Sequence, residues 1–249
     1  VNPLAFIPPV SLVLLACCQW HTVETRTLIV EFGPDKVVGN LTSNIEGFAL
    51  NFPVLSQSFR TVAADIRGHG LTTHEEDYAK ADAFYTFDNL ARDQIALLDR
   101  LGIDRFYLFG QAYWGANTAL HLFEHIPDRI KGIVISSSSM IISDENQKPY
   151  DPLGEVGRNN FLRMHQLARD KGMMAVYQDR IEFGQFWGPK VLGSPEILKE
   201  FAKAHELTSA VAFVTLPKLT PAKRANIARL LRERSVPLML MLGEVDRLL

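Results

Sequence analysis

The stretch "YLFGQAYWGANTAL", residues 107–120, decides the fold. An apolar run ends at Gly110, a tight turn follows, and from Gly115 onward the apolar residues recur at helical spacing. The sequence therefore predicts a strand, a sharp bend and a helix in immediate succession. Such a bend is typical of enzymes that hold a nucleophilic side chain at its apex. The residue at this apex is Ala112, whose methyl group cannot attack a substrate.

Short apolar runs and longer amphipathic runs alternate on both sides of this stretch. The short runs predict strands, and the longer ones predict helices. The expected strands are Thr27–Phe32, Lys36–Val38, Arg60–Asp65, 106–110, Lys131–Ser136 and Pro237–Leu242. The expected helices are Phe48–Leu55, a helix between a Thr86 cap and Gly102, Gly115–His125, and one that begins at Pro221 after a Thr220 cap. This alternation predicts an α/β fold with a mostly parallel, doubly wound sheet.

Composition limits the class of protein. The chain has 249 residues, of which 47% are hydrophobic and 22% charged, with a net charge of −2. This balance is typical of a globular protein, and it shows no basic excess that would indicate nucleic acid as a partner. No spacing typical of a metal site, a phosphate loop or a dinucleotide fingerprint stands out, so no cofactor and no metal are expected.

The apolar N-terminal run, Leu4–Cys18, permits two interpretations. Its "LLAC" segment resembles a lipoprotein processing site, but no lysine or arginine precedes Arg26, and the run is too short to span a bilayer. A buried strand at Val10–Leu15 is the favoured interpretation. Cys17 and Cys18 are adjacent and cannot link distant segments, so a reducing compartment is expected. The expected location is the cytoplasm, with a signal or lipid anchor as the alternative.

Residues 140–219 interrupt the alternation of strands and helices. They contain helical patterns such as "FLRMHQLARDKG" and "SPEILKEFAKAHEL" and no convincing strand. We expect a core at residues 1–139, a helical insertion at 140–219 and the core again at 220–249. An insertion at the carboxyl edge of a sheet would cover a pocket, for which Phe183, Phe186 and Trp187 are candidate lining residues. Packing of these aromatic side chains between the insertion and the core is the alternative.

Four segments in order resemble the α/β-hydrolase superfamily with a helical cap. They are "VAADIRGHG" (Val62–Gly70), "FYLFGQAYWG" (106–115), "PDRIKGIVISSSS" (127–139) and "LMLMLGEVDRL" (238–248). The resemblance implies a nucleophile after the second segment, an acid after the last, and a histidine after one further strand. It also implies an oxyanion hole made by two backbone N–H groups.

The resemblance assigns a role to individual residues. Ala112 occupies the position where the superfamily has serine or, in some branches, aspartate or cysteine. Trp114, also a candidate pocket residue, stands where a glycine is usual. Asn40 and Tyr113 would supply the oxyanion N–H groups, and Asp246 would be the acid. A histidine is expected beyond Asp246, but none follows in the chain, so the sequence is expected to stop before the last strand and helix. His69 is expected to be structural, and His121 and His125 to decorate a helix.

Three interpretations remain open. In the first, the chain represents an active hydrolase of esters, lactones or carbon–carbon bonds in a truncated form, with alanine engineered in place of the serine nucleophile. In the second, it is a pseudoenzyme that binds a small apolar ester- or lactone-like ligand or no ligand. In the third, the same scaffold supports a chemistry without a nucleophilic side chain. An esterase- or lactonase-like lineage that lacks normal serine-hydrolase activity is the favoured expectation. An open sheet edge would also favour self-association.

Overall fold

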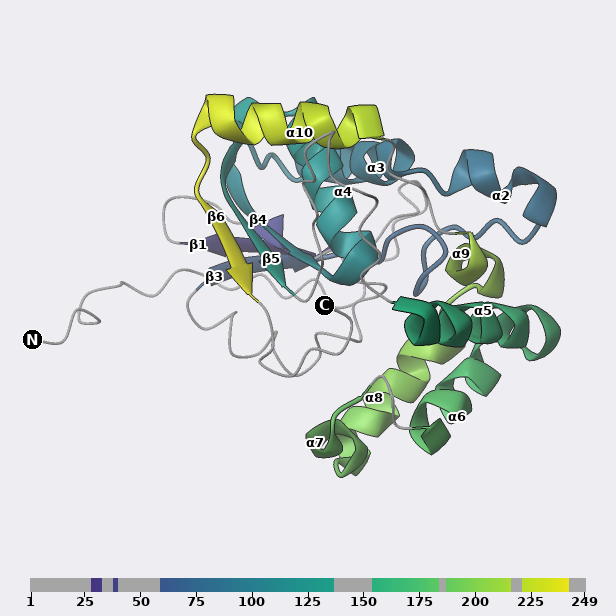
Figure 1. The fold of residues 1–249 in the computed structure, drawn as a ribbon. Helices are drawn as coiled ribbons and strands as arrows, with labels where there is room; N and C mark the ends of the chain where they lie inside the picture. The colour runs from purple at the N-terminus through teal and green to yellow at the C-terminus, as the bar shows by residue number, and fades with distance from the viewer. Residues whose placement is uncertain are drawn as a thin grey trace, which may run out of the picture.

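The structure, a computed structural model, describes residues 28–32, 38–39, 59–136, 154–183, 187–215 and 221–241. Its main sheet has four parallel strands in the order β2-β4-β5-β6 (Figure 1). Their bounds are β2 (Val38–Gly39), β4 (Phe106–Gln111), β5 (Ile130–Ser136) and β6 (Leu238–Met241). One row of residues, Val38–Leu108–Ile133–Leu238, runs across all four strands. A separate antiparallel pair joins β1 (Leu28–Phe32) to β3 (Phe59–Ala63).

The parallel sheet and its crossover helices confirm the predicted α/β class. Figure 1 shows three helices gathered beside β4, β5 and β6, namely α3 (Phe87–Arg100), α4 (Ala112–His125) and α10 (Pro221–Arg234). Helix α4 packs against β4 and β5, and both α3 and α10 pack against α4. A short 3-10 helix, Pro127–Arg129, connects α4 to β5. The core of this layer includes Phe106, Leu108, Leu122, Phe123 and Ile133, each no more than 1% exposed.

Helix α3 begins and ends as the sequence predicts. Thr86 caps it, because the Thr86 hydroxyl accepts a hydrogen bond from the Asn89 N–H at 3.1 Å, and Gly102 follows with a φ of +64°. Helix α2 (Tyr78–Phe84) precedes it and is capped by Asp77, whose carboxylate accepts from the Ala79 N–H at 2.9 Å. The sequence did not predict α2, since seven residues are too few to show a helical period.

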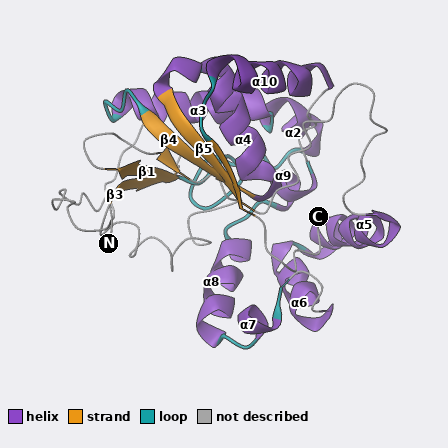
Figure 2. Cartoon of the chain, turned by 60° about the vertical axis from the view of Figure 1, so that its left-hand side comes forward, coloured by secondary structure: helices purple, strands orange, loops and turns teal. Residues whose placement is uncertain are grey.

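The described residues between 154 and 215 form helices and no named strand. The helices are α5 (Gly154–Lys171), α6 (Met173–Phe183), α7 (Pro189–Leu192), α8 (Pro195–Glu206) and α9 (Ala210–Val214). In Figures 1 and 2, α5 to α8 lie to one side of the sheet, and α9 lies between them and the sheet layer. Met164, Ala168, Met173, Val176 and Val214 form a small core of their own there. The helical character agrees with the expectation for this segment.

Backbone hydrogen bonds join these helices to the loop after β3. The Gly70 N–H donates to the Leu207 carbonyl at 2.6 Å, and the Ser209 N–H donates to the Gly68 carbonyl at 2.8 Å. Between them, His69 and Thr208 form an isolated antiparallel bridge. The loop therefore pairs with residues 207–209 as a miniature ladder, and this pairing sets how α8 and α9 meet the sheet layer.

Two expected elements, Val10–Leu15 and Phe48–Leu55, lie outside the described residues. Strand β6 stands at one end of the four-stranded sheet, and its residues Leu238, Met239, Leu240 and Met241 are 38–56% exposed. Self-association at this edge stays a prediction. In the part of the chain that the structure describes, no helix has both the length and the apolar character needed to cross a membrane.

Candidate functional site

The backbone turns from β4 directly into α4 at Ala112. Gln111 ends the strand with φ −119° and ψ 145°, and Ala112, the first helical residue, has φ 53°. A positive φ is rare for a residue with a side chain, and it costs about 1–2 kcal/mol. The helix begins at this strained residue and not at Gly115, where the sequence pattern predicted it. The chain therefore turns directly from strand to helix at a strained residue, whose exposed side chain is a methyl group.

The close approach of strand and helix depends on Gly110. A Cβ at this position would lie 2.7 Å from the Gly115 carbonyl oxygen, 2.9 Å from the Ala116 Cα and 3.0 Å from the Ala119 Cβ. These distances leave no room for a methyl group, so the small residues at 110, 115, 116 and 119 keep α4 tight against β4.

Trp114 does not open the bend, although a glycine is usual at this position. Its side chain is only 8% exposed and packs away from Gly110, with its ring centroid 5.6 Å from that of His69 and 6.1 Å from that of Phe87. The indole therefore fills core volume between α4, α3 and the loop after β3. This contact makes Trp114 a core residue in the described structure, and its role as a pocket residue stays a prediction.

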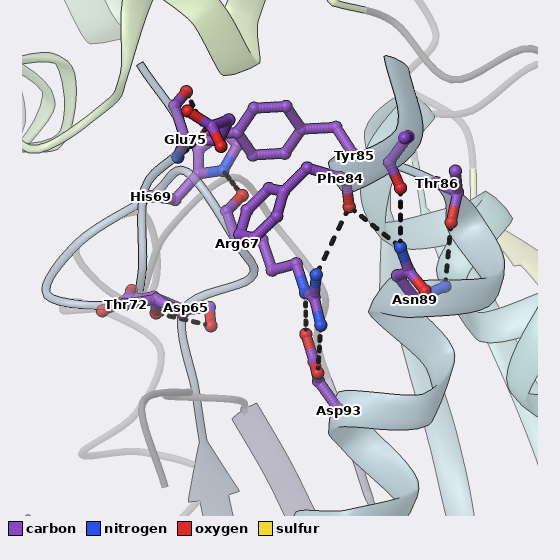
Figure 3. Close-up of polar contacts among 11 residues, drawn as sticks. Asp65, Arg67, His69, Thr72, Glu75, Phe84, Tyr85, Thr86, Asn89 and Asp93 are labelled. Carbon is purple, nitrogen blue, oxygen red and sulfur yellow. Dashed lines mark hydrogen bonds and ion pairs between the residues drawn. The ribbon is translucent and has the colours of Figure 1, made fainter. Parts of the chain in front are cut away.

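The loop after β3 is held by an arginine that bridges to α3 (Figure 3). Arg67 donates to both carboxylate oxygens of Asp93, at 2.5 Å and 2.9 Å, and its Nη1 donates to the Phe84 carbonyl at 3.4 Å. Its guanidinium also lies 4.5 Å from the centre of the Phe84 ring. A two-point contact of this kind fixes position as well as charge. Sequence inspection missed the pair, because 26 residues separate its members.

Asp65 shapes the same loop from its interior and is 2% exposed. Its carboxylate accepts from the Leu71 N–H at 3.3 Å, and its carbonyl accepts from the Thr72 hydroxyl at 2.9 Å. Gly70 has a φ of +61°, and a Cβ on it would lie 1.9 Å from an Asp65 carboxylate oxygen. Only glycine therefore fits between the buried carboxylate and Leu207, which explains the glycine spacing in "RGHG".

His69 is buried at the centre of this loop, beside Trp114. Burial lowers the pKa of the imidazole to about 4, although its Nδ1 lies 3.0 Å from the Arg67 carbonyl oxygen. The ring is thus neutral at ordinary pH and a weak base, which suits a structural role better than proton transfer. This environment agrees with the structural role expected from the sequence.

The other predicted site residues are only partly within the described structure. Tyr113 is the second residue of α4, where backbone N–H groups have no acceptor within the helix, and its side chain is 42% exposed. Gly39 pairs with Phe109, but Asn40, the next residue, lies outside the described residues, as do Asp246, Phe186 and the side chain of Phe183. The structure therefore brings Ala112, Tyr113 and Trp114 together and does not test the rest.

Trp187, the last of the aromatic candidates, packs within the helical segment. Its ring lies 5.7 Å from Tyr177, 5.1 Å from Phe201 and 5.8 Å from His205. These partners come from α6 and α8, so these contacts lie within the helical segment and do not test packing of Trp187 against the core. A role for Trp187 in a pocket stays a prediction.

Sequence comparison identifies the family to which the chain belongs. The profile of the alpha/beta hydrolase fold family matches residues 39–166, about half of the chain and the part that contains β3, β4, α4 and β5. The chain belongs to this family. An epoxide hydrolase of Siraitia grosvenorii is 38% identical over 174 residues, which are 68% of this chain and 45% of that protein. An epoxide hydrolase of Caballeronia sordidicola is 30% identical over 146 residues, 58% of this chain and 39% of that protein. The chain thus spans less than half the length of these relatives.

Solved structures of the alpha/beta hydrolase fold superimpose on most of the chain. A hydrolase from Oleispira antarctica gives a TM-score of 0.62 at 19% identity and covers 92% of this chain and 80% of its own. The enol-lactonase from Burkholderia xenovorans gives a TM-score of 0.58 at 18% identity and covers 89% and 88%. At these identities the likeness shows the fold alone.

Proposed function

We propose that the chain is an alpha/beta hydrolase of esterase, lactonase or epoxide hydrolase lineage that forms no covalent intermediate at its bend. The observation that carries the proposal is the backbone of Ala112. Its φ of 53° is the strained conformation of a nucleophile elbow, yet the residue carries no oxygen or sulfur. The match of residues 39–166 to the family supports the lineage.

The expected loss of activity is large. Enzymes of this type that lose a member of the catalytic triad retain only the roughly 10³–10⁴-fold acceleration over water that binding and an oxyanion hole supply. Turnover through an acyl-enzyme or alkyl-enzyme ester requires a nucleophile, and a methyl group cannot replace one. We therefore expect a chain with alanine at 112 to be silent towards esters and epoxides, whatever other catalytic residues accompany it.

The ligand class is proposed from the relatives and from the aromatic residues of the helical segment. Relatives are named epoxide hydrolases, and one structural neighbour is named an enol-lactonase. We propose that the helices of residues 154–215 act as a cap over a small apolar epoxide, ester or lactone. Binding of such a ligand without turnover is the form of activity left to this chain. A cytoplasmic location stays a prediction from the sequence.

The test restores a nucleophile that needs no general base. In Ala112→Asp, a carboxylate oxygen would attack an epoxide carbon, the ring carbon–oxygen bond would break, and the ring oxygen would take a proton from water. The product is an ester on residue 112, whose mass exceeds that of the protein by the mass of one epoxide. Aspartate also tolerates a positive φ better than most residues. Styrene oxide is a suitable probe, with intact-mass and peptide mapping as the readout.

The uncharged Ala112→Asn variant is the matched control. We expect the adduct only in Ala112→Asp, and we expect neither a styrene oxide adduct nor labelling by a fluorophosphonate probe in the unmodified chain. Labelling of the unmodified chain at a single residue would overturn its proposed inertness. Absence of any adduct from a folded Ala112→Asp variant would argue against an epoxide site above the bend.

A further inference from the structure

The last turn of α4 carries the sequence "HLFEH", residues 121–125. His121 and His125 are four residues apart and share one face of the helix, and Glu124 lies three residues after His121. The first turn of α3 supplies Asp88 beside them, since His125 Nε2 lies 3.0 Å from an Asp88 carboxylate oxygen. Donor atoms of Asp88, His121 and Glu124 all lie within 4.8 Å of one another. One imidazole and two carboxylates thus converge between two helices.

His121 is the fixed member of this group. Its side chain is 3% exposed, and its ring packs against Phe87 with centroids 5.1 Å apart and planes inclined by 30°. Its Nδ1 lies 2.8 Å from the Asn117 carbonyl oxygen. A carbonyl accepts only, so Nδ1 carries a proton, and Nε2 is the ring nitrogen that remains for the neighbouring carboxylates or for a metal. That arrangement is the one in which a histidine coordinates a metal through Nε2.

The two carboxylates are also oriented by neighbours. Asn226 of α10 donates from Nδ2 to Glu124 at 2.6 Å, and His125 contacts Asp88 as described above. Metal-binding residues in proteins are commonly held by such outer partners, which fix the ligand and raise its affinity for the ion. All three donor residues here have one: Asn117 for His121, His125 for Asp88 and Asn226 for Glu124. A pair of carboxylates also concentrates negative charge next to the imidazole.

We propose that Asp88, His121 and Glu124 bind one divalent cation of the zinc class, with water completing the coordination. A mixed nitrogen and oxygen set suits Zn²⁺ or Co²⁺, whereas Mg²⁺ and Ca²⁺ favour oxygen alone. Bonds of about 2 Å in a tetrahedron require donors about 3.3 Å apart, so the carboxylates must move towards the buried imidazole. The Asp88 side chain is 40% exposed, so its rotamer can change without disturbing the core.

The proposed metal site is separate from the bend. At 1.5 Å per residue along the helix, His121 lies about 14 Å from Ala112. A cation there would join the start of α3 to the end of α4 and, through Asn226, would brace α10. The cation would stabilise the packing of α3, α4 and α10. This proposal does not depend on the proposed function. The alternative is a hydrogen-bonded link between the helices that binds no metal.

The experiment measures zinc directly on the full chain. Thiolates bind zinc, so the background carries Cys17→Ser and Cys18→Ser. Protein stripped with a chelator is dialysed against Zn²⁺, and the retained metal and the melting temperature are measured. The variants Asp88→Asn and Glu124→Gln keep a hydrogen-bond acceptor for His125 and Asn226 but remove the charge. His121→Gln removes the imidazole. His74→Gln is the matched control: His74 lies 3.5 Å from the Glu76 carboxylate but, among the described residues, belongs to no group of three potential metal ligands.

We expect one Zn²⁺ per chain, a rise in melting temperature on binding, and an affinity at least about tenfold lower in Asp88→Asn, Glu124→Gln and His121→Gln. Co²⁺ bound at the same site should give visible d–d absorption that these variants lose. His74→Gln should match the background protein. Failure of the background protein to retain zinc, or equal retention by folded Asp88→Asn and Glu124→Gln variants, would overturn the proposal.

Discussion

The imidazole of His69 packs edge-on against the indole of Trp114, with the ring centroids 5.6 Å apart and the planes inclined by 70°. This contact joins the loop after β3 to the first turn of α4. It explains why a tryptophan is accommodated where a glycine is usual in the family, because the indole occupies volume that the loop and Phe87 enclose.

Replacing Trp114 by glycine, the usual family residue, should therefore weaken this chain. We expect Trp114→Gly to lower the free energy of unfolding by about 3–5 kcal/mol, from the cavity left beside His69 and the added backbone freedom in α4. Urea denaturation measures the difference. The neighbouring Tyr113→Ala change removes a 42% exposed side chain and should cost less than about 1.5 kcal/mol. Equal effects of the two changes would contradict this account of Trp114.

Gly110 should tolerate no side chain. Gly110→Ala would bring a methyl group to 2.7 Å from the Gly115 carbonyl oxygen, so α4 must shift away from β4. We expect a loss of about 2–3 kcal/mol in the free energy of unfolding, measured by urea denaturation. Gly188→Ala is the matched control, because a Cβ there meets nothing within 4 Å and its φ is −70°. A Gly110→Ala variant as stable as Gly188→Ala would show that the close approach is not needed.

The two-point contact between Arg67 and Asp93 should depend on the shape of the guanidinium. Their side chains are 22% and 16% exposed, and lysine keeps the charge but cannot reach both carboxylate oxygens and the Phe84 carbonyl. We expect Arg67→Lys to lower the unfolding free energy by about 1.5–3 kcal/mol. Arg229→Lys changes a pair whose side chains are 53% and 52% exposed, and it should cost less than about 0.5 kcal/mol. If the two variants unfold at the same urea concentration, the contact has no such role.

Acid should destabilise the fold before its carboxylates titrate. Burial lowers the pKa of His69 to about 4. Burial and, to a lesser extent, the positive charge of nearby Arg180 lower the pKa of His205 to about 4. Unfolded histidine has a pKa near 6.5, so between pH 6.5 and pH 4 the unfolded chain binds protons that the native state does not. The unfolding free energy is then highest above pH 6.5 and falls as the pH falls through this window, by up to about 3 kcal/mol for each histidine.

Urea midpoints measured at pH 7.5 and pH 5 check this prediction. His205→Gln should reduce the difference between the two midpoints, since glutamine does not titrate. Equal midpoints for the unmodified chain at the two pH values would be incompatible with neutral buried imidazoles at positions 69 and 205.

The sequence predicts the parts of this fold whose signal is local. The apolar run at 106–110 and the short run of β5 are recognisable as strands, and the Thr86 cap marks the start of α3. The alternation of these elements predicts the α/β class, because each connection in a parallel sheet needs a crossover. The order and spacing of the four segments around them identify the family. The start of α4 at Ala112 was not predicted, since an alanine gives no sign that its φ will be positive.

Features made by distant residues could not be predicted in this way. His121 was expected to decorate a helix, and the structure buries it, because α3 and α10 pack over the face of α4 that carries it. The Asp88 carboxylate, which lies near His121, belongs to a different helix, and Asn226, which donates to Glu124, is 102 residues away from it in the sequence. Neither residue spacing nor composition predicts these contacts, because they depend on how α3, α4 and α10 pack together. The Arg67–Asp93 contact could not be predicted for the same reason, because it joins a loop to a helix 26 residues away.

The ladder between Gly68–Gly70 and residues 207–209 is made by peptide groups alone. Almost any residue can supply a peptide carbonyl, so a change of side chain at Leu207 leaves its bond to Gly70 in place, whereas Ser209 also caps α9 by accepting from the Ala212 N–H at 3.3 Å. Beyond the ladder, Val211 and Ala212 of α9 pack into the core of the sheet layer, whereas α5 and α6 share a separate core. Substitutions in that separate core can therefore change how α5 and α6 pack on one another while the peptide ladder still attaches this segment to the loop after β3.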